Sequence, residues 1–430
     1  MRSAFSTVLS KHPGFCSLKV LVVSSKYPPE YSGSGLRAHR TYLRLKEKYD
    51  INFEVICSST GSNRSEAYQV DGVYVERIVS RRMRDLNRNL VRTPLRRFAN
   101  AVLSHAEARS VRRALRGKSF DVIHTFGYSP ATATAVRWSR VHHTPLVIEL
   151  VNSGATPYQY LPGMKRFSPY DLGRQSVIVA ISKNLGDICN NLGLVDNVWI
   201  RPNPVDTSGF VIATKPERLA ARRKISSVSE TDVLIVYVAK YLSRKNHSFL
   251  LEVIAKLPAR FKLVLAGPAV TDLDLVPGLT ADQIQSLTDR ARQLEISDRV
   301  EITHGFVDMA EYLAAADIFC FPAHSEGLGT PLLESISAGV PVIANADEPS
   351  FQEWIVEGAN GYLRPLNAES WAEAAILAAS FDESKKSTMS AEIKEPISVE
   401  LIDEQYMKLL NAVFSTAHDL KVNVDEVLAL

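Results

Sequence analysis

The residues Ser325-Glu326-Gly327-Leu328-Gly329-Thr330-Pro331-Leu332-Leu333-Glu334 carry more information than any other segment of this chain. Two glutamates, Glu326 and Glu334, are separated by seven residues that include two glycines and a helix-start signal. Thr330 is expected to be the N-cap, with Pro331 at the first helical position, where a missing N–H costs nothing. Glu326 would then precede the helix, and Glu334 would lie just past its first turn.

The start of this predicted helix is suited to binding an anion. The backbone N–H groups of Leu332 and Leu333 are expected to be unpaired and to point at a ligand, because the first N–H groups of a helix have no partner within it. Gly327 and Gly329 lie in the loop that would receive the same ligand. Carboxylates on both sides of an anion site suit a ligand with hydroxyl groups on both sides of a phosphate, such as a nucleotide sugar. Isolated glutamates are more often solvated surface charges, so this interpretation depends on the neighbouring sequence.

The neighbouring sequence places the glutamate pair in a unit that recurs in α/β proteins. Residues 337–344 are typical of a helix end, a tight turn and a buried strand, and residues 317–322 predict the preceding strand. Open α/β sheets bind their ligands beyond the carboxyl ends of the strands, where this loop would lie. Strand and helix patterns alternate along the chain, which predicts parallel, doubly wound sheets.

The strand patterns form two successive sets. The first set is predicted at 18–24, 53–57, 73–78, 120–124, 145–150 and 176–181, and the second at 233–238, 262–267, 300–302 and 317–321. We therefore expect two Rossmann-like domains facing across a cleft. A helix predicted near 399–417 is expected to pack back onto the first domain. The expected divisions are a lead-in at 1–18, domains at 19–205 and 206–395, and a crossover helix and tail at 396–430.

The composition is that of a soluble globular protein. The chain has 430 residues, of which 46% are hydrophobic and 23% charged, and this length is too great for one ordinary core. No segment approaches the roughly 18 apolar residues that a membrane span needs, and none has the form of a signal peptide. The cysteines lack the spacing of a metal site or a redox pair, which favours a reducing cytoplasm.

Charge is distributed unevenly along the chain. Residues 1–200 contain 29 Lys and Arg against 14 Asp and Glu, whereas the remainder contains 21 against 33. Much of the excess lies in 81–118, where apolar residues are interleaved with the basic ones. Such a stretch is typical of a surface for anionic membrane or another anionic partner, or of an ordinary solvated helix face. Nucleic acid is not expected, because no binding motif accompanies the charge. The candidate patch residues are Arg81, Arg82, Arg84, Arg88, Arg92, Arg96 and Arg97.

A second group of candidate residues opens the second half of the chain. Lys240 and Lys245 flank a short loop after the predicted strand 233–238, with a helix expected to begin near Asn246. Two cations close to the predicted anion site would neutralise a diphosphate. The alternative is that both are solvated loop lysines with no role in binding.

Two other features are ambiguous in the sequence. Gly33 and Gly35 would let the backbone of the first domain approach a phosphate closely, or they belong to a flexible surface loop. The triplet Asp272-Leu273-Asp274 carries two carboxylates that would suit a divalent cation. We interpret the triplet as a solvated loop and expect no metal site.

Taken together, these residues resemble the retaining GT-B glycosyltransferases of family 4. The E-x7-E signature of that family corresponds to Glu326–Glu334, and its phosphate loop corresponds to 239–246. Further elements follow the family's order between about residues 19 and 365. They are the glycine loop 27–35, Asp121–His124, Ala180–Asn184, Asn203–Asp206 and Gly358–Leu363.

The resemblance implies a GT-B fold and transfer of a sugar from a nucleotide-diphosphate sugar to an acceptor hydroxyl, with retention and without a metal or other cofactor. Glu334 would hold the ribose hydroxyls, Glu326 the donor sugar, and Lys240 and Lys245 the departing diphosphate. The pathway implied is polysaccharide, lipopolysaccharide or glycolipid synthesis in the cytoplasm. The acceptor would be lipid-linked or anionic, and the protein would contact the inner face of the membrane peripherally. The donor sugar, the nucleotide and the acceptor stay open.

Several positions depart from the family pattern. Lys240 stands where the family has arginine, which keeps the charge but loses the bidentate fork. Val151-Asn152 stands where the family often has histidine, so Glu149 or Asn152 is expected to take part of that sugar-side role. Glu348-Pro349-Ser350 replaces a glycine pair. The alternatives are a nucleotide-sugar epimerase on the same fold and a non-catalytic GT-B scaffold, and the two glutamates and two lysines argue against the scaffold.

Overall fold

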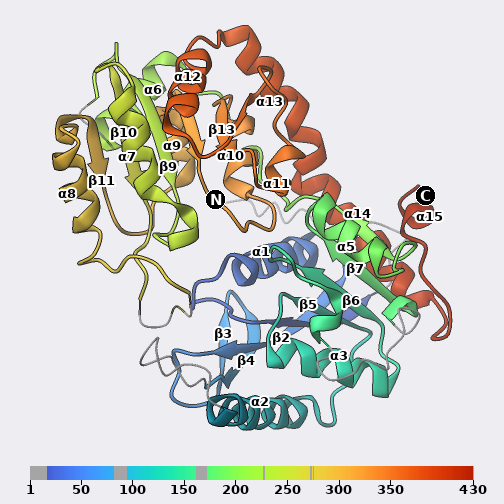
Figure 1. Ribbon diagram of the computed structural model, residues 1–430. Coiled ribbons are helices and arrows are strands. Elements are labelled where there is room, and N and C mark those ends of the chain that lie inside the picture. The colour runs from blue at the N-terminus through green and yellow to red at the C-terminus, as the bar shows by residue number, and fades with distance from the viewer. Residues whose placement is uncertain are drawn as a thin grey trace, which may run out of the picture. The chain divides into compact units, whose positions relative to one another are not determined.

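The computed structural model describes residues 17–81, 94–160, 172–225, 228–271, 274 and 276–429, without the side chains of 94–97 and 159–160. The chain forms two compact units (Figure 1). Unit 1 comprises the residues up to Ile181 together with Leu185–Arg201 and Asp403–Leu430, and unit 2 comprises Ser182–Asn184 and Pro202–Ile402. The chain therefore passes from unit 1 to unit 2 after Arg201 and returns within its last long helix.

Unit 1 is built on an eight-stranded sheet with the order β3-β4-β2-β1-β5-β6-β7-β8. Its strands are β1 (Leu18–Ser24), β2 (Ile51–Ser59), β3 (Glu66–Val70), β4 (Val73–Val79), β5 (Val122–Phe126), β6 (Leu146–Leu150), β7 (Ser176–Ala180) and β8 (Val198–Ile200). Every pairing is parallel except β3 with β4, which are antiparallel. The sequence did not predict β3 or β8, because β3 is short and half-exposed at the sheet edge and β8 has only three residues.

The helices of unit 1 come from both ends of the chain. They are α1 (Gly33–Lys48), α2 (Pro94–Leu115), α3 (Pro130–His142), η1 (Pro157–Tyr160), α5 (Lys183–Asn191), α14 (Val399–Ser415) and α15 (Val424–Ala429), although α5 and α14 begin in residues of unit 2. Tyr406, Met407, Leu410 and Val413 of α14 are buried. The prediction that the C-terminal helix packs back onto the first half of the chain is thus confirmed.

Unit 2 contains a six-stranded, fully parallel sheet with the order β11-β10-β9-β12-β13-β14. Its strands are β9 (Val233–Val238), β10 (Phe261–Ala266), β11 (Val300–Ile302), β12 (Ile318–Phe321), β13 (Val342–Asn345) and β14 (Gly361–Arg364). Counted within the unit, this is the order 3-2-1-4-5-6 of a Rossmann fold. Successive connections leave β9 and β12 in opposite directions along the sheet, so the topological switch point lies between these two neighbouring strands.

The helices of unit 2 follow the strands in alternation, as the sequence pattern predicts. They are α6 (Lys215–Ile225), η2 (Ser243–Lys245), α7 (His247–Lys256), α8 (Gln285–Gln293), η3 (Ser297–Arg299), α9 (Met309–Ala315), α10 (Thr330–Ser337), α11 (Pro349–Gln352), α12 (Ala368–Ala378) and α13 (Glu383–Ile397). The core of the unit is aromatic, with Tyr237, Phe319, Phe321, Phe351 and Trp371 each buried. No helix in the described ranges is both long enough and apolar enough to cross a bilayer.

Candidate functional site

The charged residues singled out in the second half of the chain meet at the switch point of unit 2. Lys240 and Lys245 lie in the loop that follows β9, and Glu326 lies in the loop that follows β12. The two strands are paired through Ile235–Ile318 and Val236–Phe319. Beyond their ends the two loops also touch, since the backbone N–H of His324 donates to the carbonyl of Arg244 at 3.0 Å. This position is where open α/β sheets bind ligands.

Glu326 is held between two cations. Its Oε1 accepts from the Arg244 guanidinium, and the Lys245 Nζ lies 2.9 Å from the same oxygen. The side chains of Glu326 and Lys245 are 10% and 12% exposed, whereas that of Arg244 is 37% exposed. Burial lowers the pKa of Lys245 against the opposing effect of Glu326. Arg244 was missed in the sequence analysis, although it is a third cation within the same loop.

Lys240 has a carboxylate partner of its own. Its Nζ lies 2.5 Å from Asp274 Oδ1, while the other carboxylate oxygen accepts the backbone N–H of Thr271 at 2.7 Å. The Asp274 side chain is only 14% exposed. Burial alone would raise the pKa of Asp274, but the hydrogen bonds from Lys240 and Thr271 lower it overall. Interpretation of Asp274 as a solvated loop residue is therefore wrong, whereas Asp272 and Leu273 lie outside the described residues.

The helix after the glutamate loop begins differently from the prediction. The N-cap of α10 is Gly329 with φ +88°, rather than Thr330. A Cβ on Gly329 would lie 2.6 Å from the Phe351 ring, so both the backbone conformation and the space require glycine. The Thr330 hydroxyl instead accepts from Asn203 Nδ2 at 2.8 Å. The backbone N–H of Leu332 donates to the Gly329 carbonyl at 2.9 Å. The prediction that this N–H is unpaired and points at an anion is therefore wrong.

The remaining donor-side candidates surround this helix start. Gly327 is half-buried in the loop, Leu333 is buried in the first turn of α10, and Glu334 is half-buried one residue later. The structure therefore keeps both glutamates of the signature near the start of α10. Of the two glutamates, Glu326 is the one that contacts the cations Arg244 and Lys245.

The glycines near the start of α1 have a packing explanation. Ser32 is the N-cap and accepts the backbone N–H of Gly35 at 3.0 Å. A Cβ on Gly35 would lie 2.2 Å from the Lys26 carbonyl oxygen, so the start of α1 packs directly on the loop after β1. Gly33 is exposed and has no atom within 4 Å of such a Cβ. Close approach of backbone therefore explains Gly35 without a ligand.

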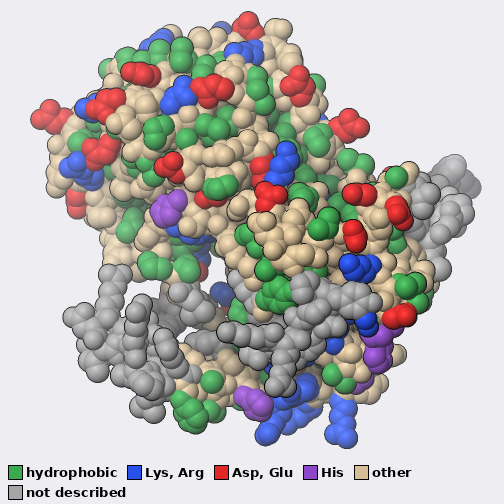
Figure 2. Space-filling view, turned by 45° about the vertical axis from the view of Figure 1, so that its right-hand side comes forward, with side chains coloured by type: hydrophobic (Ala, Val, Ile, Leu, Met, Phe, Trp, Pro, Cys, Tyr) green, Lys and Arg blue, Asp and Glu red, His purple; other side chains and the backbone are tan. Residues whose placement is uncertain are grey.

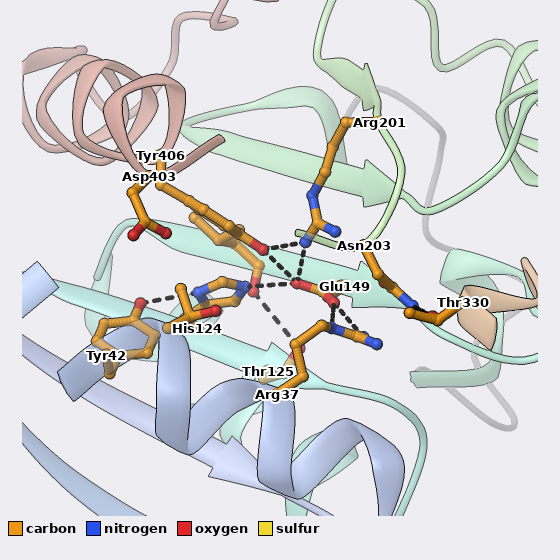
Figure 3. Close-up of polar contacts among 12 residues, drawn as sticks. Arg37, Tyr42, His124, Thr125, Glu149, Arg201, Asn203, Thr330, Asp403 and Tyr406 are labelled. Atoms are coloured by element: carbon orange, nitrogen blue, oxygen red, sulfur yellow. Dashed lines mark hydrogen bonds and ion pairs between the residues drawn. The ribbon is translucent and has the colours of Figure 1, made fainter. Parts of the chain in front are cut away.

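Glu149 lies in the core of unit 1 (Figure 3). Its side chain is 0% exposed; it accepts from Arg37 Nε at 3.0 Å, from Arg201 Nη2 at 2.8 Å and from the Tyr406 hydroxyl at 2.6 Å. Burial alone would raise the pKa of Glu149, but the two arginines hold it well below its usual range. This carboxylate does not reach the surface, so the arrangement gives it a structural role in place of the expected contact with a sugar. Asn152, the other candidate, is exposed after β6.

His124 extends the Glu149 cluster toward α1. Its Nε2 lies 3.6 Å from Glu149, and its Nδ1 lies 2.8 Å from the Tyr42 hydroxyl. Burial lowers the pKa of His124, which favours the neutral ring. In the sequence analysis His124 is only part of a family motif, because its partners Tyr42 and Glu149 come from other elements.

Most side chains of the predicted basic patch lie outside the described part of the structure. Arg82, Arg84, Arg88 and Arg92 lie outside the described residues, and Arg96 and Arg97 lie in α2 without described side chains. Arg81 is exposed. Farther along α2, the exposed side chains follow a helical spacing, beginning with Phe98 and Val102 at 68% and 52% exposure. The same outer face continues with Arg109, Arg112 and Arg113, and Arg116 follows the end of the helix. Figure 2 shows Lys and Arg side chains gathered at the lower edge of the view.

Within the described ranges, no group of three or more His, Cys, Asp or Glu side chains is arranged to hold a metal ion. Asp274 is instead engaged by Lys240.

Two family descriptions match successive parts of the chain. Residues 32–208 match Glycosyltransferase Family 4, and residues 220–395 match Glycosyl transferases group 1. The first match covers most of the N-terminal sheet, and the second covers β9 to β14 with both loops of the Glu326 cluster.

Individual proteins are similar over much of their length. The GDP-mannose-dependent monoacylated alpha-(1-6)-phosphatidylinositol monomannoside mannosyltransferase of Corynebacterium glutamicum is 26% identical over 340 residues, which is 76% of this chain and 80% of that protein. The lipopolysaccharide core biosynthesis glycosyltransferase LpsE of Rhizobium meliloti is 27% identical over 237 residues, which is 52% of this chain and 63% of that protein.

A solved structure extends the likeness to the whole fold. The crystal structure of HepE from Anabaena in complex with UDP and glucose superposes with a TM-score of 0.66 at 16% identity, covering 91% of this chain and 99% of that chain. At this identity the likeness concerns the fold, and it confirms the fold class predicted from the sequence.

Proposed function

Because this chain belongs to the glycosyl transferases of group 1 and has the GT-B fold, we propose that it moves a sugar from a nucleotide-diphosphate sugar to an acceptor hydroxyl with retention at the anomeric carbon. The observation that carries this proposal is the cluster of Glu326, Arg244 and Lys245 at the switch point of unit 2. It offers cations for a diphosphate beside a carboxylate for sugar hydroxyls, in the place where this sheet topology binds ligands.

The charges of the cluster match the charges that develop during transfer. As the bond between sugar and diphosphate breaks, negative charge grows on the leaving diphosphate and positive charge grows on the sugar ring. Lys245 and Lys240 would stabilise the diphosphate, and Glu326 would hold the donor sugar, so the binding is strongest in the transition state. Glu334 would hold the ribose hydroxyls. Fixed cations of the protein would do this without a metal.

In this structure, the cations are paired with carboxylates of the protein. Arg244 and Lys245 share Glu326, and Lys240 has Asp274. A diphosphate carries charge comparable to two carboxylates and would take over the two lysines. Glu326 would then be released from Lys245 and become available to hydroxyl groups of the sugar.

The donor nucleotide is left between two candidates by the proteins that this chain resembles. The HepE structure holds UDP and glucose, and the name of the C. glutamicum enzyme specifies GDP-mannose. The names of the relatives also support a role in polysaccharide, lipopolysaccharide or glycolipid synthesis.

The outer face of α2 supports a lipid-linked acceptor at the inner face of the membrane. Phe98 and Val102 would enter the headgroup region, and Arg109, Arg112 and their neighbours would face anionic lipid. Each basic residue near such a surface contributes about 1 kcal/mol, so binding should depend on salt. Co-sedimentation with vesicles of rising anionic lipid content tests this, with Arg96→Glu/Arg97→Glu as the weakened variant. Lack of binding to anionic vesicles at low salt would leave a soluble anionic acceptor as the better explanation.

The transferase proposal is tested by supplying UDP and GDP sugars and measuring release of the nucleoside diphosphate. Wild type should release it from one donor class, and the anomeric configuration of the product should match that of the donor. Lys256→Ala is a matched control for Lys245→Ala, because Lys256 also lies 2.9 Å from a glutamate, Glu369, but both side chains are more than half exposed. The proposal is wrong if wild type releases no nucleoside diphosphate from either donor class. It is also wrong if Lys245→Ala and Lys256→Ala release the nucleoside diphosphate at the same rate.

A further inference from the structure

Glu348 is a buried carboxylate next to the donor loop, which is the loop between β12 and α10 that carries Glu326. None of the roles above involves Glu348. It lies three residues beyond the end of β13, and the residue is only 3% exposed. Here the sequence has Glu348-Pro349-Ser350 in place of the glycine pair of the family pattern. At this segment the chain therefore departs from that pattern, and the departure brings a carboxylate.

The Glu348 side chain bonds to the loop after β12 rather than to its own helix. Glu348 is the N-cap of α11, but its side chain makes no cap hydrogen bond. Instead, its Oε2 accepts the backbone N–H of Glu326 at 3.0 Å, and its Oε1 accepts from the Ser350 hydroxyl at 3.1 Å. Both oxygens thus have partners, which is what a buried carboxylate requires.

The peptide group between Ser325 and Glu326 is held at both of its polar atoms. Its N–H donates to Glu348, and its carbonyl oxygen accepts from Arg244 Nη1 at 3.4 Å. Ser325 has φ +58°, a left-handed conformation that costs free energy for a residue other than glycine. Two positions before Ser325, the Ala323 carbonyl accepts from Asn345 Nδ2 at 3.2 Å. The loop is therefore kept in a strained conformation by contacts from β13 and from the Lys245 loop.

We propose that Glu348 is a positioning residue for Glu326: it fixes the plane of the 325–326 peptide and so the direction in which the Glu326 carboxylate leaves the loop. This inference rests on the proposed function, in which Glu326 holds the donor sugar and the lysines hold the diphosphate. Loss of Glu348 should therefore reduce turnover much more than nucleotide affinity. Small misplacements of a reacting group lower rates by up to about 10²-fold.

Two substitutions separate position from charge. Glu348→Gln removes the charge but keeps a carbonyl oxygen that accepts the Glu326 N–H. Glu348→Asp keeps the charge, but its carboxylate is one methylene shorter and falls short of that N–H. Glu348→Ala removes both. Asp347→Ala is the matched control, because Asp347 is the neighbouring carboxylate and is exposed.

Each variant is assayed for kcat, for KM of the donor and for the affinity of UDP and GDP by calorimetry. We expect kcat to fall about 10- to 100-fold in Glu348→Asp and Glu348→Ala, with KM and nucleotide affinity within about threefold of wild type. Glu348→Gln and Asp347→Ala should keep kcat within about threefold. Melting temperatures identify variants that lose activity by unfolding, and the comparison of Asp with Gln stands even if Ala does not fold.

The opposite ranking would overturn the inference. If Glu348→Asp is active and Glu348→Gln is not, charge matters and position does not. If all three variants keep wild-type kcat, or lose nucleotide affinity as much as turnover, Glu348 does not position Glu326. Failure of the proposed function looks different, because then wild type itself neither binds a nucleoside diphosphate nor releases one from a nucleotide sugar.

Discussion

Each unit of this protein contains a glutamate held between two cations, and the two clusters differ in their enclosure. Glu149 in unit 1 is 0% exposed and has two arginines, a tyrosine hydroxyl and a histidine around it. Glu326 in unit 2 is 10% exposed, and its partner Arg244 is 37% exposed. The Glu149 cluster is thus fully enclosed, whereas the Glu326 cluster reaches solvent mainly through Arg244.

This difference indicates what each cluster is for. Arg201 is the last residue before the chain leaves unit 1, and Tyr406 follows soon after its return, so Glu149 holds both ends of the connection. A closed cluster of this kind cannot exchange partners without leaving buried charges uncompensated. Glu326 lies in a loop, and under the proposed function its cations exchange a carboxylate for a phosphate. Burial, rather than residue type, separates the structural cluster from the proposed functional one.

The largest expected effect is on stability, in unit 1. Glu149→Ala leaves Arg37 and Arg201 buried without their carboxylate and should lower the free energy of unfolding by about 3–5 kcal/mol. Glu326→Gln should lower it less, because its partner Arg244 is 37% exposed and glutamine keeps an oxygen that accepts from Lys245. Calorimetric melting of the full chain compares the two variants. Equal shifts in melting temperature would show that the two clusters are not different in kind.

The next largest effect is on turnover, in unit 2. Lys240→Ala and Lys245→Ala should each lower kcat about 10²–10³-fold while the melting temperature stays close to that of wild type, by analogy with loss of one donor to a developing negative charge. Release of nucleoside diphosphate measures this, with Lys256→Ala as the control. Near-wild-type turnover in both variants would remove the assignment of these lysines to the diphosphate.

Much of this arrangement could be predicted from sequence because it depends on local patterns. Hydrophobic runs placed eleven of the strands, and chain order put the loops of Lys245 and Glu326 in the same half. The partners of Glu149 could not be found in this way. Arg201 is 52 positions away and Tyr406 is 257 positions away, and nothing in the local sequence connects them.

The errors at the donor loop have a similar physical origin. Thr330 has a hydroxyl that could cap the helix, but that hydroxyl is bonded to Asn203 and Gly329 is the N-cap. The Phe351 ring leaves no room for a Cβ at that position. Asp274 looked solvated because its partner Lys240 is 34 residues earlier in the chain. In each case a contact between distant segments overrode a local preference.

A smaller effect is expected from acid, and it should come from the histidines rather than from the glutamates. His247 Nε2 lies 3.2 Å from the carbonyl of Ala239, beside Lys240, and burial lowers the pKa of His247 to about 3. The unfolded chain binds a proton at His247 below about pH 6.5 and the folded chain does not, so stability is full above that pH and falls as the pH drops toward 3. Between pH 6.5 and 5 the loss is about 2 kcal/mol.

Urea unfolding at pH 7 and pH 5 measures this slope. His247→Gln should flatten it, although His124, whose pKa burial also lowers, keeps a similar contribution in unit 1. Glu149 stays ionised throughout this range because the arginines depress its pKa. A slope that is unchanged in His247→Gln would contradict the assignment of this pH dependence to His247.

The smallest expected effect is that of chelation. If fixed cations stabilise the leaving diphosphate, excess EDTA should leave turnover within about twofold of its value without chelator, since no ion takes part in charge stabilisation. Turnover with and without EDTA is measured on the same preparation. Complete loss that Mg²⁺ or Mn²⁺ restores would show that a metal supplies the charge stabilisation assigned to the lysines.

The most direct test of the central claim is calorimetric titration of UDP and GDP into wild type, Lys245→Ala and Lys256→Ala. The claim is that the open cluster of Glu326, Arg244 and Lys245 binds the diphosphate of the donor. We predict that wild type binds at least one nucleotide, that Lys245→Ala weakens this affinity about 10-fold or more, and that Lys256→Ala does not change it. Equal affinity in wild type and Lys245→Ala would contradict the claim.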